Sequence, residues 1–321
     1  RYLMEKIYQQ EIEQFNKYYA RCFKSKTKLL QNILGFLYQH KGKLIRPQFV
    51  IAWAKIFENN ISERTFKAAS LIELLHTATL VHDDVVDDAY FRRNKFSIKA
   101  LWGNKLAVLS GDYLLSRGLL LALENKEFDF LEILAVAVKE MSEGELLQFE
   151  KARLGNLDEP TYFNILSQKT ASLLASACAL GAASANASAH QIQLAHQFGV
   201  KMGIAFQLKD DLLDFATFST GKSKLNDLKQ KKMSLPIIYL LRKVKQVEKE
   251  QIQYLIKNIT KNSDAIPKLY QIIDEYKALE YTEKIMNTYL SNSLTSLNSL
   301  PDSEAKSTLI KLTNQIVNRE N

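Results

Sequence analysis

The 321-residue chain is predicted to be all-α, a large helical bundle. Its 11 glycines and 5 prolines are few for this length, so little interrupts long helices. No Asn-Gly or Asp-Gly pair, the usual turn of a two-residue β-hairpin, stands between runs of alternating apolar and polar residues. No linker rich in glycine, serine or proline divides the chain. We therefore expect one domain over residues 1–321.

Apolar residues recur at helical spacing along most of the chain. Pro160 and Pro236 stand at expected helix starts, where proline fits the first turn. The uncharged run from 170 to 200 is too polar to span a membrane, and its alanines and serines favour a closely packed, buried helix. The spacing predicts helices, in order, over 2–22, 25–39, 46–58, 63–88, 104–123, 128–149, 160–184, 189–216, 234–244, 247–258, 264–291 and 302–318.

Two clusters of aspartates follow long apolar segments. Each contains the pattern DDxxD: Asp83, Asp84, Asp87 and Asp88 in HDDVVDD, and Asp210, Asp211 and Asp214 in KDDLLD. If the apolar segments are helical, the acids lie near helix C-termini. Negative charge is unfavourable there, because it meets the negative end of the helix dipole and because carboxylates four residues apart repel one another. A bound cation explains this placement. Oxygen ligands favour Mg²⁺ shared with substrate phosphates.

Cationic side chains surround these clusters in the sequence. Lys43 and Arg46 stand in GKLIRP, Arg92 and Arg93 follow the first cluster, and Lys169 with Thr170 interrupts an uncharged segment; Lys222 and Lys232 follow the second cluster. Arginine and lysine bind phosphate as a fork and as a point charge, respectively. Two groups of cations suggest two diphosphates, one bound through metal ions and one without them. Any single member of these groups could instead be a surface charge.

His76 lies seven residues before Asp83, about two helical turns away and on the same face. A histidine in an apolar segment is more often a core residue, and this position makes a ligand role equally plausible. His82 points away from that face and is interpreted as structural.

The composition limits which cellular location and which binding partners are expected. The net charge of +8 could suit nucleic acid or an anionic membrane, but no supporting motif accompanies it, so we interpret it as a solvated basic face and expect no nucleic-acid partner. Cys22 and Cys178 can form neither a disulfide scaffold nor a CxxC metal site. The chain opens on a polar amphipathic segment rather than a secretory signal. We expect a reducing, cytoplasmic setting.

Four segments together resemble the trans-isoprenyl diphosphate synthases. They are LIELLHTATLVHDDVVDDAYFRR, GNKLAVLSGDYLL, KTASLLASA and GIAFQLKDDLLDF, and the similarity runs in register from about Lys41 to Pro236. The resemblance implies a helical bundle around a central cavity, a homodimer, and aspartate motifs on facing helices. It also implies elongation of an allylic diphosphate, expected to be farnesyl diphosphate, by isopentenyl diphosphate, with about two or three Mg²⁺ ions bound beside the substrate. A peripheral membrane contact would serve product release.

The resemblance also assigns roles to individual residues. Asp83, Asp87 and Asp210 are the main Mg²⁺ ligands, with Asp84, Asp211 and Asp214 in support, and Lys169 joins them as a catalytic residue. The allylic diphosphate would be held by Arg92, Lys169, Thr170, Gln207, Lys222 and Lys232. Isopentenyl diphosphate would be held by Lys43, Arg46, His76 and Arg93.

Several positions depart from the family pattern. Lys41 replaces the first glycine of the loop before the first cation pair, and Asn94 and Phe96 stand where RRGxP is usual. Leu225 and Lys231 replace glycines after the second aspartate motif. None of these changes removes an expected metal or diphosphate ligand.

Product length is expected to depend on Ala78 and Thr79, which lie about 6–7.5 Å before Asp83 along its helix. Short-chain members commonly carry an aromatic ring there, so two small side chains imply an open tunnel and a long product, around octaprenyl. Three alternatives stay open: a short-chain geranylgeranyl-type synthase, a class I terpene cyclase, and a non-catalytic synthase subunit. A cyclase would not need the second phosphate pocket, and a non-catalytic subunit would be expected to lose aspartates.

Overall fold

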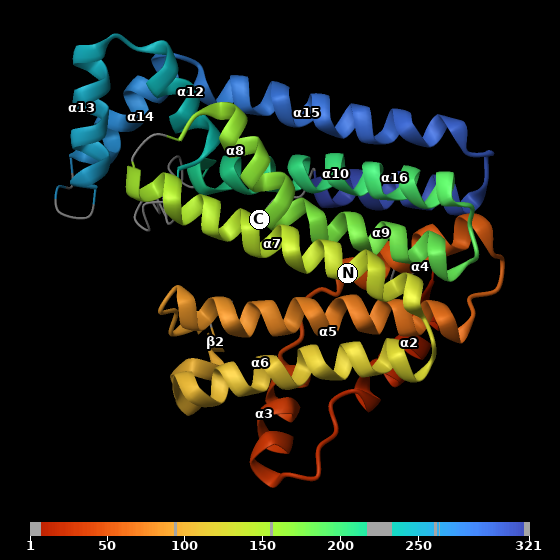
Figure 1. Cartoon of the computed structure of the whole chain (residues 1–321). Helices are drawn as coiled ribbons and strands as arrows, with labels where there is room; N and C mark the ends of the chain where they lie inside the picture. Colours follow the sequence, from red (N-terminus) through yellow and green to blue (C-terminus); the bar gives the residue numbers. More distant parts are fainter. Residues whose placement is uncertain are drawn as a thin grey trace. The chain divides into compact units, whose positions relative to one another are not determined.

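The protein is described from a computed structural model, which covers residues 8–92, 95–154, 157–216, 233–259, 262 and 264–317 (Figure 1). These residues are almost entirely helical, as predicted. They form two compact units, each assembled from several stretches of the chain. The first unit comprises Arg1–Val138, Leu173–Gly199 and Ser299–Leu312; the second comprises Lys139–Ser172, Val200–Asn298 and Thr313–Asn321. A single domain over 1–321 stays a prediction.

The first unit is organised around helix α5. Its elements are α2 (Gln9–Arg21), α3 (Lys28–Gln39), α4 (Ile45–Phe57), α5 (Glu63–Val86), β1 (Phe91–Arg92), β2 (Lys95–Phe96), α6 (Ile98–Glu124), the first part of α7 (Phe128–Leu154), most of α9 (Ser172–Ser184) and the beginnings of α10 (Ala189–Ala216) and α16 (Glu304–Val317). Helix α5 packs against α6, α4 and α2. Large buried side chains such as Phe15, Trp53 and Ile72 fill the core.

The second unit is organised around helix α12. It contains the rest of α7, α10 and α16, together with α8 (Glu159–Leu166), the π-helical turn η1 (Ser167–Ala171), α12 (Leu235–Lys243), α13 (Gln246–Lys257), α14 (Ala265–Glu275), α15 (Ala278–Ser296) and most of the short η2 (Leu297–Ser299). Helix α12 packs against α15, α8 and α14. Its core includes Phe215, Ile237, Leu240, Ile252 and Leu269.

Some elements differ from the sequence prediction. The segment 264–291 forms two helices because Lys277 adopts a left-handed backbone, with φ of 53°, between them. The predicted helix 160–184 is interrupted by the π-turn η1. Helix α6 begins at Ile98, earlier than expected, and contains a non-helical residue at Gly103. A two-strand ladder pairs Phe91 with Phe96, although no hairpin turn was predicted.

Helix α6 has an apolar outer face. Within the described ranges it is the one helix long and apolar enough to cross a membrane, and a third of that apolar stretch is buried. It lies along α5 in the first unit. We define the α6 face as the exposed large apolar residues of α6 and the start of α7: Leu101, Val108, Leu109, Leu119, Leu120, Leu123, Phe128 and Val136.

Candidate active site

The first aspartate motif occupies the C-terminal end of α5, as predicted. The helix ends at Val86, and Asp87 caps it by donating its backbone N–H to the carbonyl of Asp83, at 2.8 Å. Asp88 then takes a left-handed backbone with φ of 52°, which turns the chain toward the hairpin. Asp87 is exposed and Asp83 is half-buried, and the four-residue spacing places both on one side of the helix.

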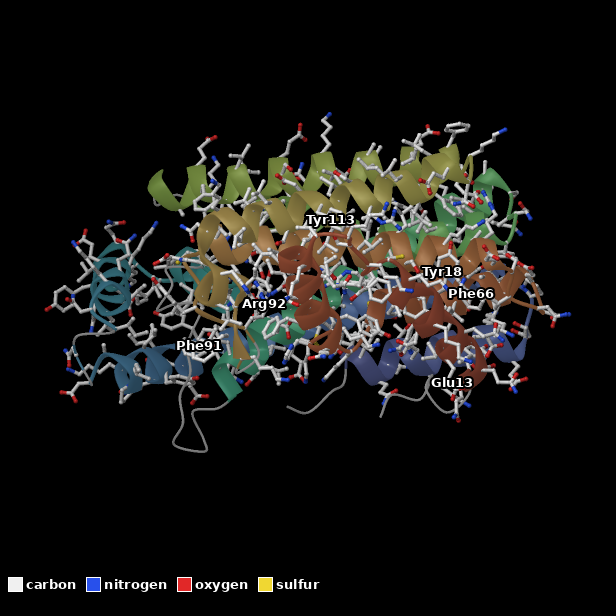
Figure 2. All side chains as sticks on the ribbon, turned by 90° about the horizontal axis from the view of Figure 1, so that it is seen from below. Glu13, Tyr18, Phe66, Phe91, Arg92 and Tyr113 are labelled. Carbon is white, nitrogen blue, oxygen red and sulfur yellow. The ribbon has the colours of Figure 1, made fainter. Side chains whose placement is uncertain are left out.

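The second aspartate of this motif, Asp84, is buried and paired with an arginine. It is only 3% exposed, and its Oδ1 accepts N–H groups from Arg92, from Nε at 2.9 Å and from a terminal guanidinium nitrogen at 2.8 Å. Arg92 projects from β1 beside Phe91 (Figure 2). Such a charge-assisted double contact is among the stronger polar interactions in proteins. Arg92, predicted to bind the allylic diphosphate, thus also orders the end of the motif.

The second aspartate motif lies in the last turns of α10 and repeats this division. Asp210 and Asp214 are half-buried, and they lie one turn apart. Asp211 between them is 4% exposed, and its Oδ2 accepts the Tyr162 hydroxyl at 2.5 Å and the backbone N–H of Leu235 at 3.0 Å. Gln207 precedes Asp210 by one turn and is half-buried.

Lys169 and Thr170 stand in the π-turn η1, where α8 passes into α9. The Lys169 ammonium contacts two side chains of α7, the Glu145 carboxylate at 2.5 Å and the Gln148 amide oxygen at 2.9 Å. A π-turn within a helical segment is rare and often marks a functional site, because the extra residue changes the direction of the side chains. The contacts with Glu145 and Gln148 hold the Lys169 ammonium against α7.

Close approach of two helices fixes the backbone of η1. A Cβ added to Gly144 of α7 would lie 2.9 Å from the Lys169 backbone nitrogen, and one added to Gly203 of α10 would lie 2.7 Å from the Ala171 Cα. Both separations are shorter than real Cβ contacts, so only glycine fits at either position. Neither glycine, nor Glu145, Gln148 or Tyr162, was singled out in the sequence. The importance of these residues follows only from their contacts in the folded protein.

The side chains expected to bind isopentenyl diphosphate lie in the first unit, as Asp83 does. Lys43 is exposed just before α4, and Gln48 secures this loop by donating its amide to the Lys43 carbonyl at 2.8 Å. Arg46 is half-buried in the first turn of α4, and His76 is half-buried within α5. The predicted residues Arg93, Lys222 and Lys232 lie outside the described residues.

The expected chain-length residues lie in the middle of α5. Ala78 is buried, and Thr79 is half-buried with its hydroxyl donating to the His76 carbonyl at 2.9 Å. Both are small. An aromatic ring in place of the Ala78 methyl group would project into space that neighbouring side chains surround.

The chemistry of the donor set fits a hard divalent cation. The accessible acids Asp83, Asp87, Asp210 and Asp214 offer only oxygen atoms, which Mg²⁺ and Ca²⁺ prefer. Among the described residues, no three aspartates, glutamates, histidines or cysteines converge as a ready metal cage. Mg²⁺ commonly binds through one or two carboxylates and completes its shell with substrate phosphates and water. Asp83 and Asp87, or Asp210 and Asp214, can supply such a pair.

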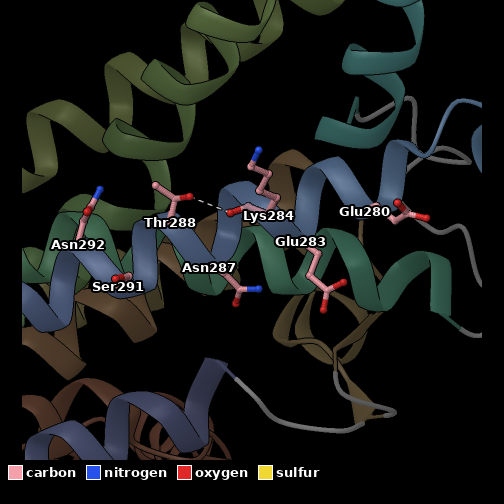
Figure 3. Close-up of a pocket in the computed structure, with 7 residues that line it drawn as sticks. All are labelled: Glu280, Glu283, Lys284, Asn287, Thr288, Ser291 and Asn292. Carbon is pink, nitrogen blue, oxygen red and sulfur yellow. Dashed lines mark hydrogen bonds between the residues drawn. The ribbon is translucent and has the colours of Figure 1, made fainter.

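A hollow elsewhere in the second unit contains none of the predicted site residues. Figure 3 shows its lining on α15, where the Thr288 hydroxyl donates to the Lys284 carbonyl at 2.9 Å. The lining residues are Glu280, Glu283, Lys284, Asn287, Thr288, Ser291 and Asn292.

The family profile described as "Polyprenyl synthetase" matches residues 27–273. The chain belongs to the polyprenyl synthetase family. It is a prenyltransferase, a polyprenyl diphosphate synthase, and both aspartate motifs lie within the matched range.

Individual relatives support the same assignment. Heptaprenyl diphosphate synthase component 2 of Geobacillus stearothermophilus is 35% identical over 292 residues, covering 88% of each chain. Decaprenyl-diphosphate synthase of Dictyostelium discoideum is 32% identical over 293 residues, which cover 91% of this chain and 63% of that protein. Among solved structures, the chain is similar to the crystal structure of a polyprenyl synthase from Caulobacter crescentus CB15, which is complexed with calcium and isoprenyl diphosphate. The TM-score is 0.88 at 29% identity, and the match covers 98% of this chain and 97% of that one. The all-α prediction is thus confirmed.

Proposed function

We propose that this polyprenyl synthetase uses Mg²⁺ to extend farnesyl diphosphate with isopentenyl diphosphate to an all-trans product around octaprenyl. The observation that carries the proposal is the repeated arrangement at the ends of α5 and α10. In each motif the first and last aspartates are the accessible ones, and the second is bound internally. One motif of this kind could be a solvated helix end. Two motifs that divide their acids in the same way support a shared function in metal binding.

Bound Mg²⁺ would neutralise the diphosphate leaving group and help the allylic C–O bond to break. Asp83, Asp87, Asp210 and Asp214 are the ligands that the structure favours. The relative crystallised with calcium and isoprenyl diphosphate supports a divalent cation in this role. Calcium and magnesium both take oxygen ligands, and Mg²⁺ retains more water and substrate oxygen in its shell.

The cationic side chains would form two groups, each of which binds one of the two substrates. Lys169, ordered by Glu145 and Gln148, would contact the allylic diphosphate and stabilise the negative charge that develops as it leaves. Lys43 and Arg46 would hold isopentenyl diphosphate so that its double bond attacks the allylic carbocation. A new C–C bond then replaces the broken C–O bond, and the released diphosphate accepts the proton that the product loses.

The proposed product length rests on the small side chains at Ala78 and Thr79. A growing apolar chain that extends from Asp83 along α5 would pass this level, because both residues lie within about 7.5 Å of it along the helix. The heptaprenyl and decaprenyl names of the two relatives bracket the octaprenyl length.

We also propose that the enzyme is a homodimer, formed through the α6 face. The six exposed large apolar residues of α6 recur at helical spacing on one side of that helix, and exposed apolar surface of this kind marks an interaction site. Helix α6 carries Lys105, Asp112 and Arg117 within its apolar sequence, which disfavours lipid as the covering partner. Sedimentation of the purified protein tests this, and a monomer at micromolar concentration would contradict it. A cytoplasmic location, with a transient membrane contact for product release, completes the proposal.

The deciding experiment is elongation by the purified chain. The protein is incubated with Mg²⁺, labelled isopentenyl diphosphate and farnesyl diphosphate, and the dephosphorylated products are separated by reversed-phase chromatography. A ladder ending near octaprenyl supports the proposal, and a C20 product supports a geranylgeranyl-type synthase. A cyclic hydrocarbon would indicate a terpene cyclase. The absence of product would favour a non-catalytic subunit, and adding a separately purified partner subunit would then be the next test.

A further inference from the structure

We propose that Tyr162 is a positioning residue of the second aspartate motif, and that Asp211 acts as its anchor rather than as a metal ligand. The proposal rests on the proposed function, since it concerns how the same site is assembled. It assigns a role to a tyrosine that does not itself contact a reacting group. All the residues that carry it belong to the second unit.

The contact between the two side chains is short and buried. The Tyr162 hydroxyl donates to Asp211 Oδ2 at 2.5 Å, and each of the two residues is 4% exposed. An O–H to carboxylate hydrogen bond of this length is in the range of charge-assisted bonds, which are about twice as strong as neutral ones. A buried carboxylate that lost such a donor would be costly, because water cannot readily replace it.

A second donor contacts the same Asp211 oxygen and competes with any metal ion for it. The backbone N–H of Leu235 reaches Oδ2 at 3.0 Å, so both lone pairs of this oxygen are used. Asp211 also points about 100° away from Asp210 around the helix, whereas Asp210 and Asp214 differ by only about 40°. The face that offers accessible acids is therefore that of Asp210 and Asp214.

The anchor joins three elements that the site needs. Tyr162 lies in α8, which passes directly into the π-turn bearing Lys169 and Thr170. Leu235 is the first residue of α12, and Asp211 lies between the accessible acids of α10. One carboxylate oxygen thus fixes the start of α12 and the helix before Lys169 against the helix that carries Asp210. Loss of the hydroxyl should shift Lys169 relative to those acids.

The first test replaces Tyr162 with Phe, which keeps the ring and removes only the hydroxyl. The KM for farnesyl diphosphate should rise about tenfold, because small misplacements of binding groups have large kinetic effects. The Mg²⁺ concentration for half-maximal rate should stay as in the wild type, since no metal ligand is altered. Tyr276→Phe is the matched control: it removes a hydroxyl that donates to Glu248 at 3.0 Å, between α14 and α13, and should change neither parameter.

The anchor itself supplies the second test. Asp211→Asn keeps an oxygen that can accept from Tyr162 and Leu235, so it should retain more activity than Asp211→Ala. The double variant Tyr162→Phe with Asp211→Ala should be no worse than Asp211→Ala alone, because both changes break one interaction. These comparisons also hold if Tyr162→Phe is less stable, because Asp211→Asn preserves the bond.

The outcomes are distinct. A Tyr162→Phe enzyme with wild-type KM overturns the positioning role. If Asp211→Asn raises the Mg²⁺ requirement as strongly as Asp210→Asn does, Asp211 is a ligand and the proposal is wrong. Failure of the proposed function has another signature, because the wild-type protein itself would then form no elongated product with Mg²⁺.

Discussion

Substituting Gly203 by alanine tests whether the backbone of the π-turn must stay in place. The added Cβ would lie 2.7 Å from the Cα and 2.8 Å from the Cβ of Ala171, whereas ordinary contacts begin near 3.4 Å. The two helical segments must therefore separate by roughly 0.7 Å, and overpacking of this kind costs about 1–3 kcal/mol. Because Ala171 follows Lys169 and Thr170 directly, the displacement should also move the groups proposed to hold the allylic diphosphate.

We expect Gly203→Ala to lower the free energy of unfolding by about 1–3 kcal/mol in urea titrations. A shift of these groups approaching 1 Å should lower kcat/KM for farnesyl diphosphate by about 10- to 100-fold. Gly35→Ala is the control, since a Cβ added to Gly35 on α3 would meet nothing within 4 Å. That change should stabilise the helix by about 0.5–1 kcal/mol and leave the kinetics unchanged. A Gly203→Ala enzyme with wild-type stability and kinetics would refute the reasoning.

Three further outcomes are expected. Asp83→Ala or Asp210→Ala should abolish elongation while the melting temperature is kept or slightly raised, because a like-charge pair worth about 0.2–0.5 kcal/mol is removed; near-normal turnover in saturating Mg²⁺ would contradict the metal assignment. Lys43→Ala should raise the KM for isopentenyl diphosphate more than that for the primer, and Lys169→Ala should do the reverse; equal effects on both substrates would contradict the division into two pockets. Ala78→Tyr should shorten the main product made from farnesyl diphosphate to about C20, because the wall around Ala78 is close-packed and a ring there would fill the passage; an unchanged product distribution in an active variant would contradict this account of length control.

The placement of the aspartate motifs was predictable because long apolar segments precede each one. Helix α10 carries the second motif and is described as far as Ala216, and α5 ends two residues earlier than expected because Asp87 and Asp88 form its cap and turn. The π-turn was not predictable, since a single extra residue in a helical turn leaves the composition unchanged.

The different roles of the aspartates within each motif could not be predicted from the sequence either. The sequence makes Asp210 and Asp211 look alike, and only their surroundings separate them. One donor to Asp211 is the Tyr162 hydroxyl, which is 49 residues away along the chain. The donor to Asp84 is Arg92, whose spacing suggested a phosphate ligand and whose position in β1 turns it back onto the motif. Local patterns cannot report such contacts between elements.

The two cysteines make this protein convenient for spectroscopic labelling. Both are free thiols and both are buried, and burial raises the pKa of Cys22 to about 11 and that of Cys178 still further. Since the thiolate is the reactive form, neither should react readily with maleimides near neutral pH. A cysteine introduced at Val247, which is 79% exposed on α13, would then carry a fluorophore alone, without removal of the native thiols. Motions during the catalytic cycle could be followed in an otherwise unaltered enzyme.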